Sequence, residues 1–516
     1  MKRCPRCSRD YYDDGQFYCL EDGNRLIDIG LPSLDPATLK LNLRTESPTV
    51  TFAPSEEKSI AILPFKNLTG NDACQFYEFS LADALITELA RLRSLTVRPS
   101  SVIASYLGTN IDPRVAGKEL MVDSVLSAGF IYSDARVRVT AQLLDVSTGH
   151  IIWSDRIDSE SGDIFALQDT ITRRILDGLD FDPSSSEQKF IGQRPTTSNE
   201  AYEEYLRGRD SLGRFMFRTL LLTDCDAAIK CFKRAIDLDP KFALAWSGLG
   251  ACFANKTAKG IGGREEVLEA RTALEMALSL NPNIVEAHVL MGYNHLANGD
   301  KKSARAELNY VLERYPNTAA TFFLKGLLHR LDGEYEESLD SWAKLERLDP
   351  SSIVVTRCQR ARIFSMQNNN ELALKELEFA AAAEPNHPFV KVFRSQVLFY
   401  SGELEEASNA MQTLLDENPH LDGVRPLLAV FLAAQDRRDE AYENLSEDTL
   451  RLAHVDYDVA YWAASAYALL GETDEALKWL ERAVKLGLGD KIRFQTDKTL
   501  DSIKNDPRFA ELLSRI

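Results

Sequence analysis

The chain has few cysteines, no long apolar run and no signal-like start, and each absence narrows what it can be. Its 516 residues include only 8 cysteines, too few for a secreted scaffold stapled by disulfides. No stretch approaches the roughly 18 uncharged apolar residues that a membrane-spanning helix needs. Met1-Lys2-Arg3-Cys4 is not followed by an apolar run, so we expect no secretory signal there. These absences predict a cytoplasmic protein without a membrane span.

Positive charge is also scarce. The chain has 60 lysines and arginines against 78 aspartates and glutamates, which gives a formal net charge of −18 at pH 7. A protein that holds nucleic acid by its phosphates needs a basic surface. Residues 1–28, where a small ribbon could serve this purpose, contain more acidic than basic residues. The charge balance therefore argues against a nucleic-acid partner.

Motifs of common enzyme chemistry are missing too. The chain has no Gly-x-x-x-x-Gly-Lys-Ser/Thr, no Gly-x-Ser-x-Gly and no His-Glu-x-x-His. The glycine-rich run from Lys259 to Arg264 could form an anion nest, but no strand precedes it and a simple loop is the favoured interpretation. His288, His295 and His329 are expected to pack between helices, because no carboxylate–histidine arrangement is apparent. We predict that the protein is not an enzyme.

The chain does have a regular spacing of prolines. Four of the five intervals between successive prolines are 34 or 35 residues in the series Pro240, Pro282, Pro316, Pro350, Pro385 and Pro419. A small or apolar residue stands five and twelve positions before most of them, as Ala235 and Ala228 do before Pro240. These positions share one face of a helix, where small size lets another helix approach closely. The spacing predicts an array of helical hairpins.

One hairpin resembles the tetratricopeptide repeat (TPR) signature of a large apolar residue, Leu-Gly, an aromatic, two alanines and a closing proline: Trp246, Leu249, Gly250, Phe253, Ala270, Leu274, Ala277 and Pro282. The resemblance implies an all-α superhelical solenoid of about eight hairpins over residues 195–490. The seventh hairpin lacks its proline. We expect residues 491–516 to form capping helices, because the last repeat of an array otherwise exposes its apolar side.

TPR family geometry also suggests a partner site. In the family, the first helices of the hairpins line a concave groove, and the corresponding positions here are Asn255, Tyr293, Phe323, Leu327, Arg330, Arg362, Val392, Gln396, Phe399 and Tyr400. Aromatic residues and arginine dominate binding energy at interfaces. The resemblance therefore implies an apolar peptide or helix with an acidic residue or two as the partner. The alternative for each of these side chains is packing against the next hairpin.

Residues 58–182 form a different module. Short apolar runs, amphipathic stretches and the alternation from Arg136 to Asp145 predict the order β-α-β-α-β-β-β-α, an α/β sandwich. The stretches SIAILPF, SLADALITELARL, GKELMVDSVLSAGFIY, RVRVTAQLLDVSTGHIIWSDR and DIFALQDTI resemble the amino-terminal TolB, FlgO-like domain. In that family the domain often precedes TPR arrays in bacterial signalling proteins, behind a winged helix, a kinase or an adenylate cyclase. None of these output domains is seen in this chain.

Residues 1–28 resemble a two-knuckle zinc ribbon. Cys4, Cys7 and Cys19 supply three of the thiolates that such a site needs, and Asp22 stands where the fourth cysteine belongs. We predict a structural zinc held by these four residues, since so short a segment buries too little surface to fold alone. The alternative is a relic that has lost its metal. Residues 29–57, with Pro32, Pro36, Pro48 and Pro54, read as a flexible linker.

The sequence thus predicts a multidomain protein: a zinc-ribbon-like knuckle, an α/β domain and a TPR solenoid. The favoured function is a non-catalytic protein–protein interaction scaffold or adaptor in bacterial signalling or envelope-related assembly. The alternative is a nucleic-acid-binding transcriptional regulator, or a regulatory subunit, that acts through the ribbon.

Overall fold

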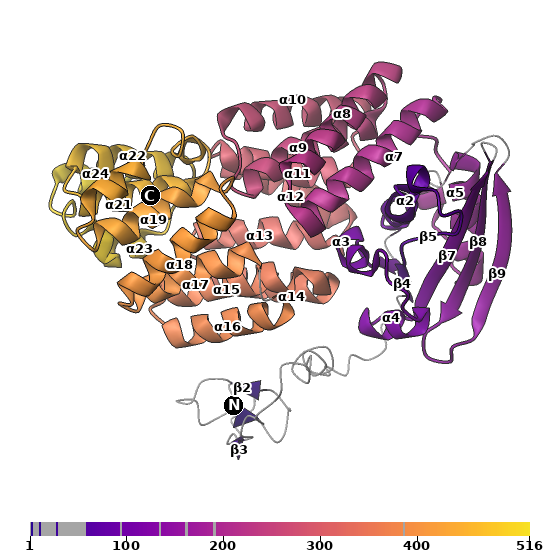
Figure 1. The fold of residues 1–516 in the computed structure, drawn as a ribbon, viewed down its shortest axis with the longest axis horizontal. Coiled ribbons are helices and arrows are strands. Elements are labelled where there is room, and N and C mark those ends of the chain that lie inside the picture. The colour runs from indigo at the N-terminus through magenta and orange to yellow at the C-terminus, as the bar shows by residue number, and fades with distance from the viewer. Residues whose placement is uncertain are drawn as a thin grey trace.

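The computed structural model describes residues 58–516 apart from 93–94, 134–135, 160–163, 189–191 and 385–386, together with three short strands near the N-terminus (Figure 1). Strands β1 (Lys2–Arg3), β2 (Asp10–Tyr11) and β3 (Ile27–Asp28) pair antiparallel in the order β2-β1-β3. The predicted zinc ligands Cys4, Cys7, Cys19 and Asp22 and the predicted linker 29–57 lie outside the described residues.

The middle module is built on a mixed sheet in which β6 (Leu95–Val97), β4 (Lys58–Ile62), β7 (Ser124–Ser133), β8 (Arg136–Asp145) and β9 (Ile151–Ser159) are neighbours in that order. β4 pairs parallel with β6 and β7, and the meander β7-β8-β9 is antiparallel. The predicted element order is confirmed. The sequence interpretation missed β5 (Lys66–Asn67), which pairs with β7, and α3 (Ser100–Ile103).

Alternating side chains on β8 decide which face of the sheet is covered. Val137, Val139 and Leu143 are buried beneath α2 (Tyr77–Leu89) and α5 (Ile164–Gly178), while Arg136 and Arg138 are exposed on the other side. α3 and α4 (Pro113–Glu119) cover only the β4 end of that second face, through a smaller apolar cluster. The sheet therefore has one fully packed face and one face that is wet over β8 and β9.

Eight helical hairpins follow, and they form the predicted solenoid. Their helices pair in sequence as α7 (Asn199–Arg214) with α8 (Leu222–Leu238), α9 (Ala243–Ala258) with α10 (Arg264–Leu280), α11 (Val285–Ala297) with α12 (Lys301–Arg314), α13 (Ala319–Leu331) with α14 (Tyr335–Leu348), α15 (Ile353–Met366) with α16 (Asn370–Ala383), α17 (Pro388–Tyr400) with α18 (Leu404–Glu417), α19 (Arg425–Ala433) with α20 (Arg438–Glu443), and α21 (Tyr457–Leu469) with α22 (Thr473–Lys485). Helices α23 (Lys491–Thr496) and α24 (Pro507–Ser514) close the chain.

Small residues at the signature positions set the distance between paired helices. Ala228, Ala270 and Ala304 have no exposed surface. Gly326 faces the ring of Trp342 from the second helix of its own hairpin, and a Cβ there would lie 2.7 Å from the ring carbon Cζ2. The glycine thus lets a tryptophan fill the space between α13 and α14, in a repeat whose Leu-Gly pair has become Lys-Gly.

The α/β module does not pack as a domain separate from the solenoid. One apolar cluster runs without a break from the sheet through α2 and α5 into the first two hairpins. Across this junction the Arg209 guanidinium donates to Asp83 at 2.8 Å and to Glu286 at 3.0 Å. The module and the first hairpins therefore share a core.

The module touches the solenoid at a second place, far along the array. The Arg98 guanidinium donates to the carbonyl oxygens of Leu120, at 2.7 Å, and of Arg347 and Leu348, each at 3.1 Å. The last two carbonyls end α14, where a helix has no internal donors left for them. Ser101 also donates to Asp349 at 2.6 Å. The module consequently bridges the first hairpin and the end of the fourth.

Within the described ranges of the chain, none of the helices combines the length and the apolar character that a membrane span requires.

Candidate partner-binding groove

The ten residues predicted to form the partner groove lie on the first helices of the hairpins, as expected, but the C-terminal repeats lie against several of them. Arg330, Arg362, Val392, Gln396 and Phe399 are all buried, between 2% and 9% exposed. Asn255, Tyr293, Phe323 and Leu327 are half-buried, and Tyr400 is 39% exposed. In this structure the last two hairpins of the same chain occupy much of the concave face.

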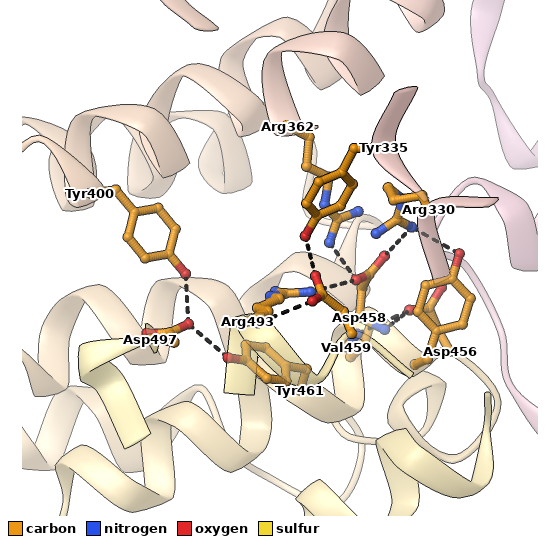
Figure 2. A network of polar contacts seen from close by, with 12 residues as sticks. Arg330, Tyr335, Arg362, Tyr400, Asp456, Asp458, Val459, Tyr461, Arg493 and Asp497 are labelled. Carbon is orange, nitrogen blue, oxygen red and sulfur yellow. Dashed lines mark hydrogen bonds and ion pairs between the residues drawn. The ribbon is translucent and has the colours of Figure 1, made fainter. Parts of the chain in front are cut away.

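The contact centres on one carboxylate. Asp458, in the first turn of α21, accepts a hydrogen bond from Arg330 Nη2 at 3.1 Å and forms an ion pair with Arg362 Nη2 at 2.5 Å (Figure 2). Arg493 Nη1, from α23, lies 3.6 Å from the same carboxylate. Arg330 also donates to the phenol oxygen of Tyr457 at 3.0 Å. Three guanidiniums therefore share one buried carboxylate, two from the groove and one from the C-terminal side.

The ratio of three guanidiniums to one carboxylate determines the pKa shifts of these groups. Burial by itself raises the pKa of Asp458, but Arg330, Arg362 and Arg493 outweigh it and hold the pKa below its usual range. For Arg362 the balance is the reverse: burial lowers the pKa of its guanidinium to about 10, and Asp458 only partly offsets this. A buried charge that loses its partner costs much more than the net worth of the pair. Loss of Asp458 would therefore leave Arg330 and Arg362 buried without their shared carboxylate.

A second set of polar contacts surrounds this centre. Asp497 accepts from the phenols of Tyr400, at 3.2 Å, and Tyr461, at 2.8 Å, so it joins the groove to α21 (Figure 2). Arg493 lies 3.9 Å above the ring centre of Tyr461. Asp490 accepts from the phenol of Tyr335. Each of these carboxylates comes from the C-terminal segment, and each contacts a residue of the repeats before it.

Apolar packing continues the same interface. Val392 and Phe399 belong to one cluster with the buried residues of α19, α21 and α22, and Phe399 stacks on Phe431 with ring centres 4.9 Å apart. At the edges the backbones meet directly. Gly489 N donates to Leu331 O at 2.9 Å, and a Cβ on Gly299 would lie 2.0 Å from Lys485 O. The C-terminal repeats are therefore packed into the groove and do not merely touch its rim.

The opposite part of the groove is less covered. Tyr293 donates to Ala320 O at 3.3 Å, and its ring lies 5.9 Å from that of Phe323. Asn255 donates to Ala251 O of its own helix at 2.9 Å. These residues have hydrogen-bond partners within the repeats and keep part of their surface accessible.

The other residues noted in the sequence take structural positions. His288 contacts Glu307 Oε2 at 2.6 Å and Pro282 O at 2.8 Å, and His329 contacts Glu334 at 2.5 Å, so the expectation of no carboxylate–histidine arrangement is wrong. Both nitrogens of His288 have partners and its ring packs on Tyr310, so its position is that of a packed core residue. Of the run from Lys259 to Arg264, residues 259–263 form the loop between α9 and α10, and Arg264 begins α10. Among the residues that the structure describes, no cluster of His, Cys, Asp or Glu could hold a metal ion.

Sequence reasoning missed Asp458, Arg493 and Asp497. A signal existed for the first: α21 reads YDVAYWAASAYAL, an almost wholly apolar helix with a single acid in its first turn. Such an acid on a buried helix needs a partner cation. The sequence pattern does not indicate that its partner arginines, Arg330 and Arg362, stand 128 and 96 residues away, in hairpins four and five.

Comparison with known families agrees with the repeat architecture. Models described as tetratricopeptide repeats match residues 222–283, 289–353 and 457–486. Residues 56–174 match the second domain of HilA/YgeH-like transcriptional regulators, where the sequence resemblance pointed to the FlgO/TolB domain. The chain is thus a TPR-repeat protein, mostly helical, with a small sheet module before its repeats.

Individual relatives are similar over parts of the chain. A putative adenylate cyclase 3 of Rhizobium meliloti is 29% identical over 208 residues, 40% of this chain and 35% of the cyclase. Anaphase-promoting complex subunit 3 of Schizosaccharomyces pombe is 26% identical over 159 residues, 31% of this chain and 23% of that protein. The chain therefore spans about a third or less of these relatives. Among solved structures, the human IFIT1 dimer with m7Gppp-AAAA is similar with a TM-score of 0.41 and 14% identity, over 62% of this chain and 77% of that one.

Proposed function

We propose that the chain is a non-catalytic protein-interaction scaffold whose partner is a peptide or helix held by the concave face of the repeats. The observation that supports it most is that the first helices already hold a helix, α21, by one acid between Arg330 and Arg362, while Phe399 packs on Phe431 of the neighbouring α19 in the same apolar cluster. That is the partner chemistry which TPR geometry suggests for these positions. The surface is therefore competent to hold such a segment.

We further propose that this scaffold acts in the cytoplasm, in bacterial signalling or in envelope-related assembly. The match of residues 56–174 to a domain of transcriptional regulators, and the similarity to part of a putative adenylate cyclase, support a regulatory module. The resemblance to FlgO/TolB domains of bacterial signalling proteins supports the same role. On this proposal the module positions the repeats, through Arg209 and Arg98, and the repeats recruit the partner.

The test uses the accessible part of the groove, because replacing its buried residues would confound binding with folding. Asn255→Ala combined with Tyr293→Ala removes two half-buried side chains from α9 and α11. We expect this variant to keep its melting temperature within a few degrees and to lose most of the partner captured by the full-length chain. Leu268→Ala with Met276→Ala, two exposed residues on the outer helix α10, is the matched control. Equal capture by both variants would refute the groove.

A second candidate function has one observation in its favour. The family that matches residues 56–174 is named for transcriptional regulators, which fits a nucleic-acid-binding regulator or regulatory subunit acting through the N-terminal ribbon. The net charge of −18 opposes it. Titration of the full chain with generic DNA and RNA at low salt decides between the two. Salt-sensitive micromolar binding would support the regulator, and no binding up to about 100 μM would leave the scaffold.

A structural zinc ion at Cys4, Cys7, Cys19 and Asp22 is also a proposal. Tetrahedral zinc takes thiolates and, less often, a carboxylate. We expect about one zinc per full-length chain by elemental analysis, and little in the Cys7→Ser variant. A wild-type chain purified without chelator that holds less than a few tenths of a zinc would refute the site.

A further inference from the structure

We propose that Tyr457 and Asp458 act as an internal copy of the partner's binding sequence, so that the groove selects a helix that begins with an aromatic–acid pair. This inference rests on the proposed function and names the chemistry of the partner. It is carried by the network around Asp458 and by the residues that α21 turns toward the groove.

The groove itself contributes two buried positive charges, and the C-terminal repeats supply the negative charge that balances them. Arg330 and Arg362 are 2% and 5% exposed, and the carboxylate that acts on both of them is Asp458. Arg493 belongs to α23 and would leave together with Asp458 if the C-terminal repeats moved away. The groove would then hold two guanidiniums that had lost their shared carboxylate in an apolar setting. Such a site demands an acid, since uncompensated buried charge is strongly unfavourable.

The second step is the pattern on α21. Tyr457 accepts from Arg330, Asp458 pairs with both arginines, and the ring of Trp462 lies 5.8 Å from the guanidinium carbon of Arg362. The helix begins at a side-chain cap, because Asp456 accepts from the backbone N–H groups of Asp458, at 2.8 Å, and Val459, at 3.0 Å. An acid in a first helical turn is also favoured by the helix dipole.

These contacts define the partner by chemistry. It is a helix whose first turn carries a tyrosine followed by an aspartate, with a large aromatic four residues after the acid, as in Tyr457-Asp458-Val459-Ala460-Tyr461-Trp462. A helical segment of another protein with this pattern would compete with α21 for the same arginines. The C-terminal repeats then act as the resting occupant of the groove.

The experiment measures competition in the full-length chain. The probe is a fluorescent, N-acetylated peptide of residues 453–466, and its matched control is the same peptide with Asp458→Asn. We expect weak binding of the probe to the wild-type chain and at least about tenfold tighter binding to a full-length Asp458→Asn variant, in which the internal copy is weakened. The control peptide should bind neither chain.

Folding is checked with a second variant and with a surface control. Tyr457→Phe removes only the hydroxyl group that accepts from Arg330 and leaves Asp458 in place. This milder variant should raise the affinity for the probe by a smaller factor, and it provides the test if Asp458→Asn proves unstable. Asp474→Asn, whose side chain is 88% exposed, should bind the probe as the wild type does. If folded Asp458→Asn and Tyr457→Phe chains bind both peptides equally, or neither, the inference is overturned. The proposed groove would still be supported if the Asn255 and Tyr293 variant loses its partner.

Discussion

At the scale of single residues, the molecule depends on a few arginines that hold distant segments together. Arg209 is the clearest case, because its guanidinium is 13% exposed and contacts Asp83 from the module and Glu286 from the third hairpin. Asp83 is only 2% exposed at its side chain, so it has no access to water as an alternative partner. Asp458 shows the converse arrangement, because there one carboxylate is shared by guanidiniums from distant segments.

Replacement of Arg209 should therefore destabilise the folded protein. Arg209→Met keeps the apolar stem and leaves the Asp83 carboxylate buried without a cation, which we expect to lower the free energy of unfolding by about 3–5 kcal/mol. Arg271→Met is the control, since Arg271 pairs with Glu275 on an exposed helix face and should cost less than about 0.5 kcal/mol. Urea denaturation of both variants measures the difference. Similar values would mean that the Arg209 pair is solvated.

His387 should make stability depend on pH. It begins α17 by accepting from Phe389 N with its Nδ1, at 3.2 Å, and burial together with Lys259 lowers its pKa to about 4. Between pH 6.5 and 4 the unfolded chain takes up a proton that the folded chain refuses, so this contribution to stability is complete above pH 6.5 and is lost as the pH falls toward 4. His387→Asn keeps a capping acceptor without titrating. The variant should therefore lose less melting temperature than the wild type across that window, and parallel curves would contradict the assignment.

At the scale of elements, the C-terminal helices complete the solenoid. Phe494, Leu500, Ile503, Phe509 and Leu512 are at most 5% exposed and join the core of the last hairpins. An array without such a cover would expose an apolar side. The segment thus packs where a cap is predicted to lie, and its position beside α21 also brings Arg493 close to Asp458 and Asp497 close to Tyr461.

The cap can be tested with two isoleucines of one segment. Ile503 has no exposed surface, and Ile503→Ala should cost about 2–5 kcal/mol through lost contacts and a cavity. Ile492 is 68% exposed, and Ile492→Ala should be nearly neutral. Thermal melts of the two variants, with truncation after residue 490 as the extreme case, measure the effect. A truncated chain as soluble and stable as the full one would show that no cap is needed.

How far the sequence could predict these elements depends on the range of the forces that form them. The alternation on β8 and the proline spacing near Pro282 and Pro316 are local, and they indicated strands and hairpins correctly. Repeat arrays are expected to contact only their neighbours. The pairing of Arg330 with Asp458 joins residues 128 apart, and no local period reports it. For that reason the sequence could place the ten predicted side chains on the first helices of the hairpins, but it could not indicate that the C-terminal repeats pack against several of them.

At the scale of the whole molecule, the shared core should make the module and the solenoid unfold together. Gly213 of α7 lies at their contact, where a Cβ would lie 2.5 Å from the Cε1 atom of Phe79 on α2. Overpacking of this kind typically costs about 1–3 kcal/mol, because rings and backbones must shift. A wedge here acts on the junction and leaves the interior of each part intact.

We therefore expect Gly213→Val to separate one calorimetric transition into two, with the module melting apart from the repeats. Gly208→Ala is the matched control, since a Cβ there would lie 2.7 Å from the ring of Phe232 inside the first hairpin and does not touch the module. It should lower the melting temperature while a single transition remains. Multidomain proteins with small interfaces melt in separate steps even without a wedge. A wild-type chain with two transitions would contradict the single core that joins the sheet to the first hairpins. A Gly213→Val chain with one transition would show that the contact at Gly213 is not what couples the two parts.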